Sequence, residues 1–157
     1  MRRPSKRILI LLQYEQSDKS KDSEARQAVK DGAQEIDIVI PLGLLLSTPP
    51  QYCHLFNHLR TIISAVAPIP VKVILETCLL PTPELKIVAS VVSAEAGAAF
   101  VKTSTGFSVG GATKNDVSLL YRAVNYKGNV KVKASGGIRS FAVCQELFRA
   151  GAERIGT

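Results

Sequence analysis

The sequence predicts an α/β fold, in which strands and helices alternate along a single domain spanning residues 1–157. One layout recurs around Gly32, Gly97 and Gly151: a helical stretch ends at Gly-Ala, and an apolar strand begins a few residues later. These strands are apolar on both faces, which is typical of parallel strands buried under helices. The alternation therefore predicts right-handed βαβ units and a parallel sheet.

About six short apolar segments are predicted as strands, namely Ile8–Leu12, Ile36–Ile40, Val71–Glu76, Ala98–Lys102, Val130–Lys133 and Arg154–Gly156. Apolar residues at three-to-four spacing predict helices over Tyr52–Val66, Leu85–Ala96, Val117–Val124 and Val143–Ala150. Thr82 is expected to cap the second of these helices, with Pro83 at its first position, and Ser140 precedes the last. The polar stretch Gln13–Ser23 is expected to be a loop.

Two architectures fit this pattern, a doubly wound sheet and a (β/α)8 TIM barrel. A nucleotide-binding doubly wound sheet requires a glycine-rich turn after its first strand, whereas Ile8–Leu12 continues into Gln13-Tyr-Glu-Gln-Ser-Asp. Polar and charged residues instead follow the carboxyl ends of several strands, where barrel enzymes place their active sites. The barrel is favoured, and six strands make it an incomplete one, with open edges at its first and last strands.

Composition excludes several classes of protein. With 46% apolar and 21% charged residues the chain is neither a disordered tail nor a membrane protein, and no apolar run approaches a membrane span of about 18 residues. The net charge of +7 is spread along the chain without interleaved aromatic residues, so no nucleic-acid partner is predicted. A small anionic substrate is compatible with this charge, and ordinary surface charge explains it best.

Cysteine usage indicates a reducing compartment, the cytoplasm. The three cysteines have no CxxC spacing and no adjacent histidine pair that would complete a metal site. His54 and His58 are interpreted as polar residues of an amphipathic helix. Neither a metal nor another cofactor is predicted.

Two lysines end two predicted strands, Lys102 and Lys133. Burial and a neighbouring ammonium both lower the pKa of a lysine and so increase its fraction of nucleophilic neutral amine. A pair of strand-end lysines is therefore the arrangement that a Schiff-base enzyme needs, although each could also be a solvated strand-end residue.

Carboxylates and glycines complete the candidate site. Asp37 lies inside an apolar strand, where burial is costly unless the carboxylate is paired or functional. Glu35 is expected on the solvated rim, and Glu76 could reach the barrel mouth. A salt bridge to a lysine of a neighbouring strand, such as Lys72 or Lys131, is the alternative for such carboxylates. Gly136 and Gly137, followed by Arg139, follow a lysine-bearing strand and could present backbone N–H groups to phosphate, as could Gly156.

Four segments resemble the deoxyribose-phosphate aldolase family. They are Glu35-Ile-Asp-Ile-Val-Ile, Lys72-Val-Ile-Leu-Glu-Thr-Cys-Leu-Leu, Phe100-Val-Lys-Thr-Ser-Thr-Gly-Phe-Ser-Val-Gly-Gly-Ala-Thr and Val132-Lys-Ala-Ser-Gly-Gly-Ile-Arg. The resemblance runs from about Glu24 to Thr157, in the family's order. It implies a metal-free class I aldolase that cleaves 2-deoxyribose 5-phosphate to acetaldehyde and glyceraldehyde 3-phosphate in deoxyribonucleotide catabolism.

The resemblance also implies the roles of individual residues. It gives the Schiff-base role to Lys102, that of a second, tuning lysine to Lys133 and that of a proton-relay carboxylate to Asp37. Substrate and phosphate contacts are implied for Thr105, Gly106, Gly136, Gly137, Arg139 and Gly156.

The chain departs from the family pattern at both ends. The family's first two βα units and its closing C-terminal helix have no counterpart, and Gln13–Ser23 lacks the family's usual Phe-Pro-x-Gly sequence. Two functions therefore stay open: an aldolase that forms a homo-oligomer or acts alone, and a catalytically impaired barrel remnant that acts as a binding or interaction protein.

Overall fold

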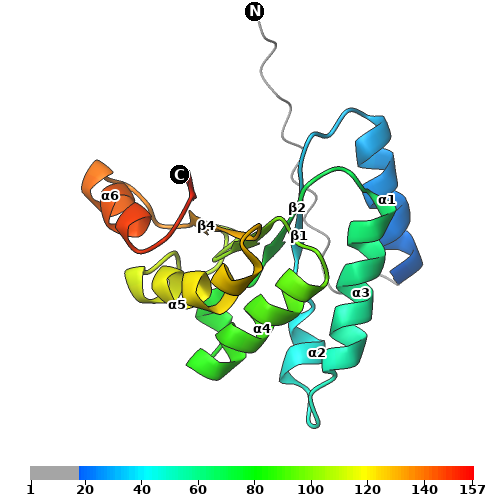
Figure 1. Ribbon diagram of the computed structural model, residues 1–157, viewed down its shortest axis with the longest axis horizontal. Coiled ribbons are helices and arrows are strands. Elements are labelled where there is room, and N and C mark those ends of the chain that lie inside the picture. The colour runs from blue at the N-terminus through cyan, green and yellow to red at the C-terminus, as the bar shows by residue number, and fades with distance from the viewer. Residues whose placement is uncertain (1–17) are drawn as a thin grey trace, which may run out of the picture.

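The computed structural model describes residues 18–157, and its centre is a five-stranded parallel sheet with the order β1-β2-β3-β4-β5 (Figure 1). The strands are β1 (Ile36–Val39), β2 (Val71–Ile74), β3 (Phe100–Lys102), β4 (Lys131–Ser135) and β5 (Arg154–Gly156). Each strand pairs with the next one along the chain, as the right-handed crossovers of a barrel require. The predicted strand Ile8–Leu12 lies outside the described residues.

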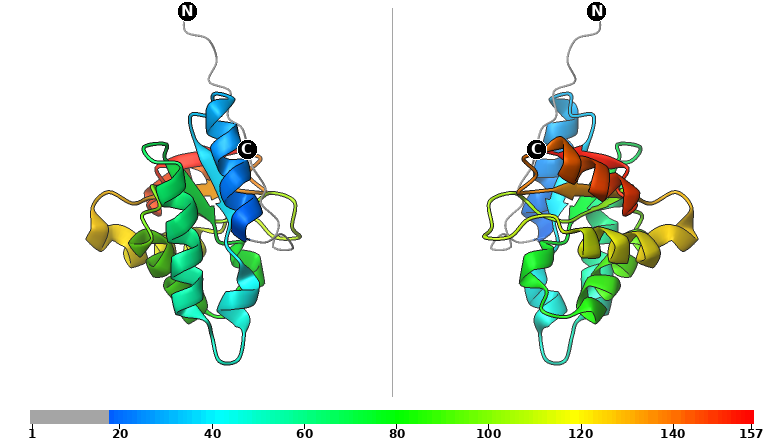
Figure 2. Two further views of the ribbon diagram at one scale, coloured as in Figure 1. Left: turned by 90° about the vertical axis from the view of Figure 1, so that its right-hand side faces the viewer. Right: turned by 90° about the vertical axis from the view of Figure 1, so that its left-hand side faces the viewer.

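Apart from the short α2 (Leu42–Leu46), which lies at the lower end of Figure 1, the helices lie side by side along one face of this sheet (Figures 1 and 2). The bounds of these helices are α1 (Asp18–Lys30), α3 (Tyr52–Ala65), α4 (Pro83–Glu95), α5 (Lys114–Val124) and α6 (Phe141–Arg149), with 3-10 turns η1 (Thr77–Leu79) and η2 (Asn125–Lys127). Contacts run from α1 to α3, from α3 to α4, from α4 to α5 and from α5 to α6. Neighbouring helices in space, α2 apart, are thus neighbours along the chain, as in the outer helical ring of a (β/α)8 barrel. No helix within this described part of the chain is long and apolar enough to cross a membrane.

Alternation along the strands sends apolar side chains to the helices and polar side chains to the opposite face. Ile36 and Ile38 of β1, like Val71 and Val73 of β2, are buried in the hydrophobic core. Asp37, between the two isoleucines, faces the other side of the sheet together with the lysines of the later strands. The inner face is therefore charged, and it carries the candidate site.

The predicted helix cap at Thr82 is confirmed, and Ser140, expected only to precede the last helix, also caps it. The Thr82 side chain accepts a hydrogen bond from the Leu85 N–H with Pro83 in the first turn, and the Ser140 side chain accepts one from the Val143 N–H. Gly151 ends α6 at a φ of +112°, and a Cβ there would lie 2.5 Å from Cγ of Tyr121. A side chain at this position is excluded by both the backbone and the neighbouring ring.

Several expected element bounds are wrong. The segment Gln13–Ser23 is not all loop, because α1 already begins at Asp18. The predicted strand Val71–Glu76 ends at Ile74, since Glu76 turns into the left-handed region at a φ of 50°. The β4 strand continues past Lys133 to Ser135, and α2 follows Pro41 where no helix was predicted.

Candidate active site

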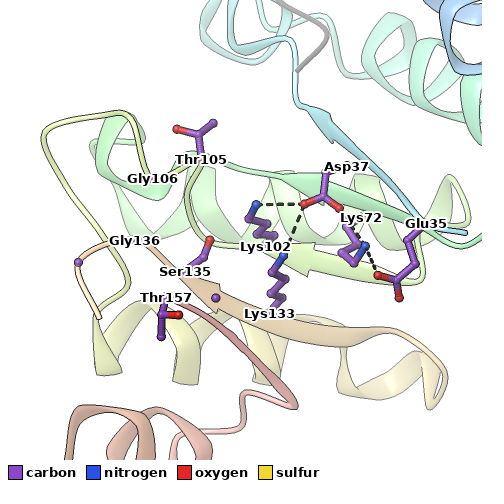
Figure 3. A pocket seen from close by; sticks show the side chains of 12 residues that line it. Glu35, Asp37, Lys72, Lys102, Thr105, Gly106, Lys133, Ser135, Gly136 and Thr157 are labelled. Atoms are coloured by element: carbon purple, nitrogen blue, oxygen red, sulfur yellow. Dashed lines mark hydrogen bonds and ion pairs between the residues drawn. The ribbon is translucent and has the colours of Figure 1, made fainter. Parts of the chain in front are cut away.

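A cavity of about 380 Å³ lies against the charged face of the sheet and reaches the loops at the carboxyl ends of its strands (Figure 3). Charged side chains, small polar side chains and glycines line it. They are Glu35, Asp37, Lys72, Lys102, Thr105, Gly106, Lys133, Ser135, Gly136, Gly137, Gly156 and Thr157. Residues from both halves of the chain thus meet in one pocket.

Asp37 is the centre of the charged cluster. Its Oδ1 accepts a hydrogen bond from Lys72 Nζ at 2.9 Å, and its Oδ2 accepts one from Lys102 Nζ at 3.0 Å. Lys133 Nζ lies 3.6 Å from the same Oδ2. The register of the sheet produces this convergence, because Asp37 is paired with Lys72 and Lys102 is paired with Lys133 on adjacent strands.

Burial and charge act in opposite directions on this carboxylate. Burial alone would raise the pKa of Asp37, but the hydrogen bond and charge of Lys72, with the charges of Lys102 and Lys133, outweigh it and lower the pKa. The Asp37 side chain is therefore held ionised although it is only 7% exposed.

Lys133 shows the opposite balance. Burial lowers the pKa of its ammonium, and the charges of Lys102 and Lys72 lower it further. The charge of Asp37 and the contact with it raise the pKa, but they do not compensate. Lys133 thus gives up its proton more readily than an ordinary lysine.

Glu35 extends the cluster to the far edge of the sheet. Its Oε2 lies 2.9 Å from Lys72 Nζ, and Arg154 Nη1 donates to its two oxygens at 2.7 and 2.8 Å. The Arg154 guanidinium also lies 4.5 Å from the centre of the Phe100 ring. Burial would raise the pKa of Glu35, but the hydrogen bonds and charges of Lys72 and Arg154 lower it.

Glycines form the rim at the carboxyl ends of β3 and β4. Gly106, Gly136 and Gly137 have φ values of +97°, +88° and +72°, which L side chains rarely adopt. Gly111 lies so close to the Gly136 carbonyl that a Cβ on Gly111 would collide with it, and the Ala112 N–H donates to that carbonyl at 3.0 Å. This close approach holds the two loops together.

Hydroxyl groups join the same two strand ends below the rim. The Thr103 hydroxyl donates to the Ser135 carbonyl at 3.0 Å and accepts from the Ser135 N–H at 3.1 Å. The Ser135 hydroxyl donates to the Ser104 carbonyl at 2.6 Å. These contacts fix the positions from which Lys102 and Lys133 project.

Most of the residues singled out from the sequence lie together. Asp37, Lys102 and Lys133 meet at hydrogen-bonding or ion-pair distance, and Thr105, Gly106, Gly136, Gly137 and Gly156 line the same cavity. Arg139 is exposed and is not part of the lining.

The two remaining carboxylates depart from expectation. The expectation that Glu35 lies on the solvated rim is wrong, because β5 brings Arg154 against it and only 19% of its side chain is exposed. Glu76 is buried and forms no hydrogen bond or ion pair with the described strand lysines Lys72, Lys102 and Lys133; it accepts a hydrogen bond from the Thr105 amide instead.

Lys72 was expected only as a possible salt-bridge partner of a strand carboxylate, and its pairing with Asp37 confirms that expectation. Lys72 is buried, with 2% of its side chain exposed, and it bridges Asp37 and Glu35. The criterion that selected Asp37, a charge inside an apolar strand, applies equally to Lys72 in Val71-Lys-Val-Ile-Leu and would have placed it in the candidate site. Among residues 18–157, no three His, Cys, Asp or Glu residues are grouped in a way that could hold a metal ion.

The parallel sheet, its outer row of helices and a charged pocket at the strand ends define an incomplete (β/α)8 barrel of the aldolase class. A family model described as DeoC/LacD family aldolase matches residues 6–155. The chain belongs to the DeoC/LacD aldolase family.

Known proteins that the chain resembles agree with this family. It is 48% identical over 141 residues to a deoxyribose-phosphate aldolase of Clostridium kluyveri, covering 89% of the chain and 62% of that relative. It is also 48% identical over 139 residues to the deoxyribose-phosphate aldolase of Thermotoga maritima, covering 88% of the chain and 54% of that relative. The chain thus spans little more than half the length of these curated relatives.

Solved structures give the same fold. A deoxyribose phosphate aldolase from Aeropyrum pernix, described as having a unique tetrameric structure, superposes with a TM-score of 0.77 at 32% identity. That match covers 96% of this chain and 63% of the Aeropyrum chain. An aldolase named QR15 superposes with a TM-score of 0.85 at 38% identity, covering 96% of this chain and 67% of that one.

Proposed function

We propose that this chain is a Schiff-base aldolase that cleaves 2-deoxyribose 5-phosphate to acetaldehyde and glyceraldehyde 3-phosphate. The observation that carries the proposal is the convergence of Lys102 and Lys133 on one buried carboxylate, Asp37, beside a glycine-rich rim. Membership of the DeoC/LacD aldolase family supports the reaction, and the names of the relatives support the substrate. The described residues act as one partial-barrel domain in this proposal.

Lys102 is the nucleophile in this proposal. Its neutral Nζ attacks the aldehyde carbon C1 of the open-chain sugar, and loss of water gives an iminium ion. Both lysines lie in segments that resemble the family, and the resemblance gives the Schiff-base role to Lys102 in Lys-Thr-Ser-Thr-Gly and the tuning role to Lys133. The Lys102 ammonium is 3.0 Å from Asp37, so a proton acceptor is at hand.

Asp37 and Lys133 move protons. The bond between C2 and C3 breaks when the C3 hydroxyl loses its proton, and the electron pair of that bond neutralises the iminium to an enamine. Protonation of the enamine at C2 and hydrolysis then release acetaldehyde and restore the lysine. The pKa of Lys133 is lowered, first by burial and then by the neighbouring ammoniums, so this side chain gives up a proton more readily than an ordinary lysine, which suits a group that donates a proton in this reaction.

The glycine rim binds the phosphate in this proposal. Gly106, Gly136 and Gly137 line the cavity, and their backbone N–H groups meet no acceptor among the described residues. Such N–H groups bind phosphate oxygens well, and the nearby ammoniums add favourable charge. The exposed Arg139 follows this rim and would contact the phosphate only at its outer side.

Partners and compartment are part of the same proposal. We propose a homo-oligomer, as the solved Aeropyrum relative is described as a tetramer, and light scattering after size exclusion measures this directly. We place the protein in the cytoplasm, since Cys53, Cys78 and Cys144 are all free.

The proposal is tested by trapping the Schiff base. The protein is incubated with acetaldehyde and borohydride, and intact mass followed by peptide mapping should show one added ethyl group on Lys102. Lys102→Met should lose the adduct; methionine is preferred to alanine because Lys102 is only 4% exposed and its volume must be kept.

A neighbouring lysine provides the control. Lys131 is on β4, two residues before Lys133, but its side chain is 48% exposed and paired with Glu153. Lys131→Met should retain the full adduct. A folded wild-type chain that forms no adduct contradicts the aldolase and favours the impaired barrel that binds without catalysis.

A further inference from the structure

Glu76, at the point where β2 leaves the sheet, is a buried carboxylate that the proposed mechanism does not use. Its φ of 50° and ψ of 60° lie in the left-handed region, and it is the one non-glycine residue with a positive φ in the described range 18–157. Its side chain is buried, with the residue only 3% exposed. Backbone strain of this kind persists where the surrounding structure enforces the conformation, and it is most frequent at functional sites.

The backbone on both sides of Glu76 is bound to the end of β3. The Leu75 N–H donates to the Lys102 carbonyl at 2.8 Å, and the Thr77 N–H donates to the Thr103 carbonyl at 2.9 Å. The side chain of Glu76 adds a third link, because both its oxygens accept from the Thr105 N–H at 3.3 Å. Glu76 therefore contacts the loop that begins directly after Lys102.

No basic side chain in the described part of the chain forms an ion pair with Glu76. Besides the Thr105 amide, its side chain contacts Cys78, whose Sγ lies 3.8 Å from Oε1. A buried carboxylate without a cation is costly unless hydrogen-bond donors reach it. The Thr105 amide is such a donor, so the cost of burying Glu76 is offset only while the loop keeps its present conformation.

This contact decides which amides of the loop are left for a ligand. The Thr105 N–H is used by Glu76, and the Phe107 N–H donates to the Thr105 hydroxyl at 3.1 Å. Between them, the Gly106 N–H meets no acceptor among the described residues, and Gly106 lines the cavity.

We propose that Glu76 is a positioning residue of the site: by holding the Thr105 amide it fixes the loop that leaves the Gly106 amide free for an anionic group of the substrate. The anion is the phosphate of a sugar phosphate, and in this respect the inference rests on the proposed function. Glu76 acts through the loop and does not touch the reacting atoms.

Three variants separate the hydrogen bond from backbone strain. Glu76→Gln keeps an acceptor oxygen at the same distance from the backbone. Glu76→Ala removes the acceptor and keeps the left-handed strain, while Glu76→Gly removes the acceptor and the strain together, so that it folds even if the alanine variant does not. The loop contact is lost in both of these, and it is kept in the glutamine variant.

Three measurements are made on each variant in the full chain. Amide hydrogen exchange, followed by NMR, reports whether the Thr105 N–H is protected. The shift of the Gly106 amide on titration with inorganic phosphate gives the dissociation constant for the anion. Borohydride trapping with acetaldehyde, which carries no phosphate, reports on Lys102 alone.

We expect Glu76→Gly to speed exchange of the Thr105 amide and to weaken phosphate binding, each by about tenfold, the loss that corresponds to one hydrogen bond. Adduct formation with acetaldehyde should stay within about threefold of wild type, and Glu76→Gln should stay within about threefold in all three measurements. This split between phosphate and acetaldehyde would not arise from general loosening of the fold.

Three results would overturn the inference. They are unchanged Thr105 exchange in Glu76→Gly, an equal loss of phosphate binding in Glu76→Gln, and a Gly106 amide that does not respond to phosphate in the wild-type chain. Failure of wild type to trap acetaldehyde would count against the proposed aldolase alone, because the exchange and phosphate measurements judge Glu76 without it.

Discussion

Replacing Asp37 by asparagine removes the one negative charge on which three lysines converge. Two ammoniums lie at 2.9 and 3.0 Å from the carboxylate and a third at 3.6 Å. A single charge pair near 4 Å contributes about 4 kcal/mol at an effective dielectric constant near 20, and desolvation offsets part of it. Breaking one buried pair costs about 3–5 kcal/mol, because the partner is left uncompensated.

We therefore expect Asp37→Asn to lower the free energy of unfolding by about 3–5 kcal/mol at pH 7. This is a large part of the total stability of a domain, which is about 5–15 kcal/mol. Urea unfolding followed by circular dichroism measures the change. Asp116→Asn is the matched control, since Asp116 is similarly enclosed but pairs with a single lysine, Lys86, and should cost less.

The pH dependence gives a second measure of the same effect. Since the pKa of Asp37 is lowered in the folded state, its contribution is complete above its unfolded pKa and is lost as the pH falls through the folded value. The difference between wild type and Asp37→Asn should be constant between about pH 7 and pH 5 and should shrink below about pH 4. If the variant does not fold, Lys102→Met in the same chain should restore folding, because it removes an ammonium whose one ion-pair partner among the described residues is Asp37.

A loss below about 1 kcal/mol at pH 7 would refute this reasoning, since it would equal that of an exposed pair. So would a loss that does not diminish in acid, because the effect would then not arise from the ionised carboxylate.

Three further predictions concern other positions. Lys133→Met should raise the Tm at pH 7 by a few degrees, because burial lowers the pKa of Lys133 and its ammonium therefore destabilises the fold. The same variant should reduce adduct formation at Lys102. A lower Tm would contradict this reasoning. Gly151→Ala should cost about 1–3 kcal/mol more in urea unfolding than Gly32→Ala, since both have positive φ but only Gly151 has a ring in the way; equal losses would refute the packing argument. The hydrogen bond to Glu95 raises the pKa of Tyr126 to about 12, so the tyrosinate absorbance that Tyr126→Phe removes should appear near pH 12. The stability that this bond contributes should be complete below about pH 10 and should be lost as the pH rises from there through about 12. An absorbance step near pH 10 would show that the bond is absent.

Local sequence patterns were sufficient to predict the order of the five described strands and of the longer helices between them. A glycine that ends a helix, a Thr-Pro pair that starts one and a short apolar run that forms a buried strand are all properties of adjacent residues. For this reason β5 lies where it was predicted, at Arg154–Gly156, and α4 begins at Pro83 after its Thr82 cap.

Other features depend on contacts that no local pattern contains. The expectation for Glu35 was wrong because its partner, Arg154, is 119 residues away in the sequence. The first residues of α1 are polar and show little apolar periodicity, so its start was not predicted. The helix contacts the hydrophobic core through small residues, Ala25 and Ala28. Asp37 and Lys102 were recognisable as isolated charges in apolar strands, but their pairing became visible only through the register of β1, β2 and β3.

The contact between Glu35 and Arg154 has a geometric consequence for the sheet. The two residues belong to opposite ends of the order β1 to β5, and in a flat sheet strands four spacings apart would be about 19 Å from each other. Their side chains nevertheless meet at 2.7 Å, so the sheet is bent and the ion pair crosses its concave side from one outer strand to the other. The bend that encloses the cavity is therefore held by a link between the outermost described strands, and any change that flattens the sheet must first separate these two charges.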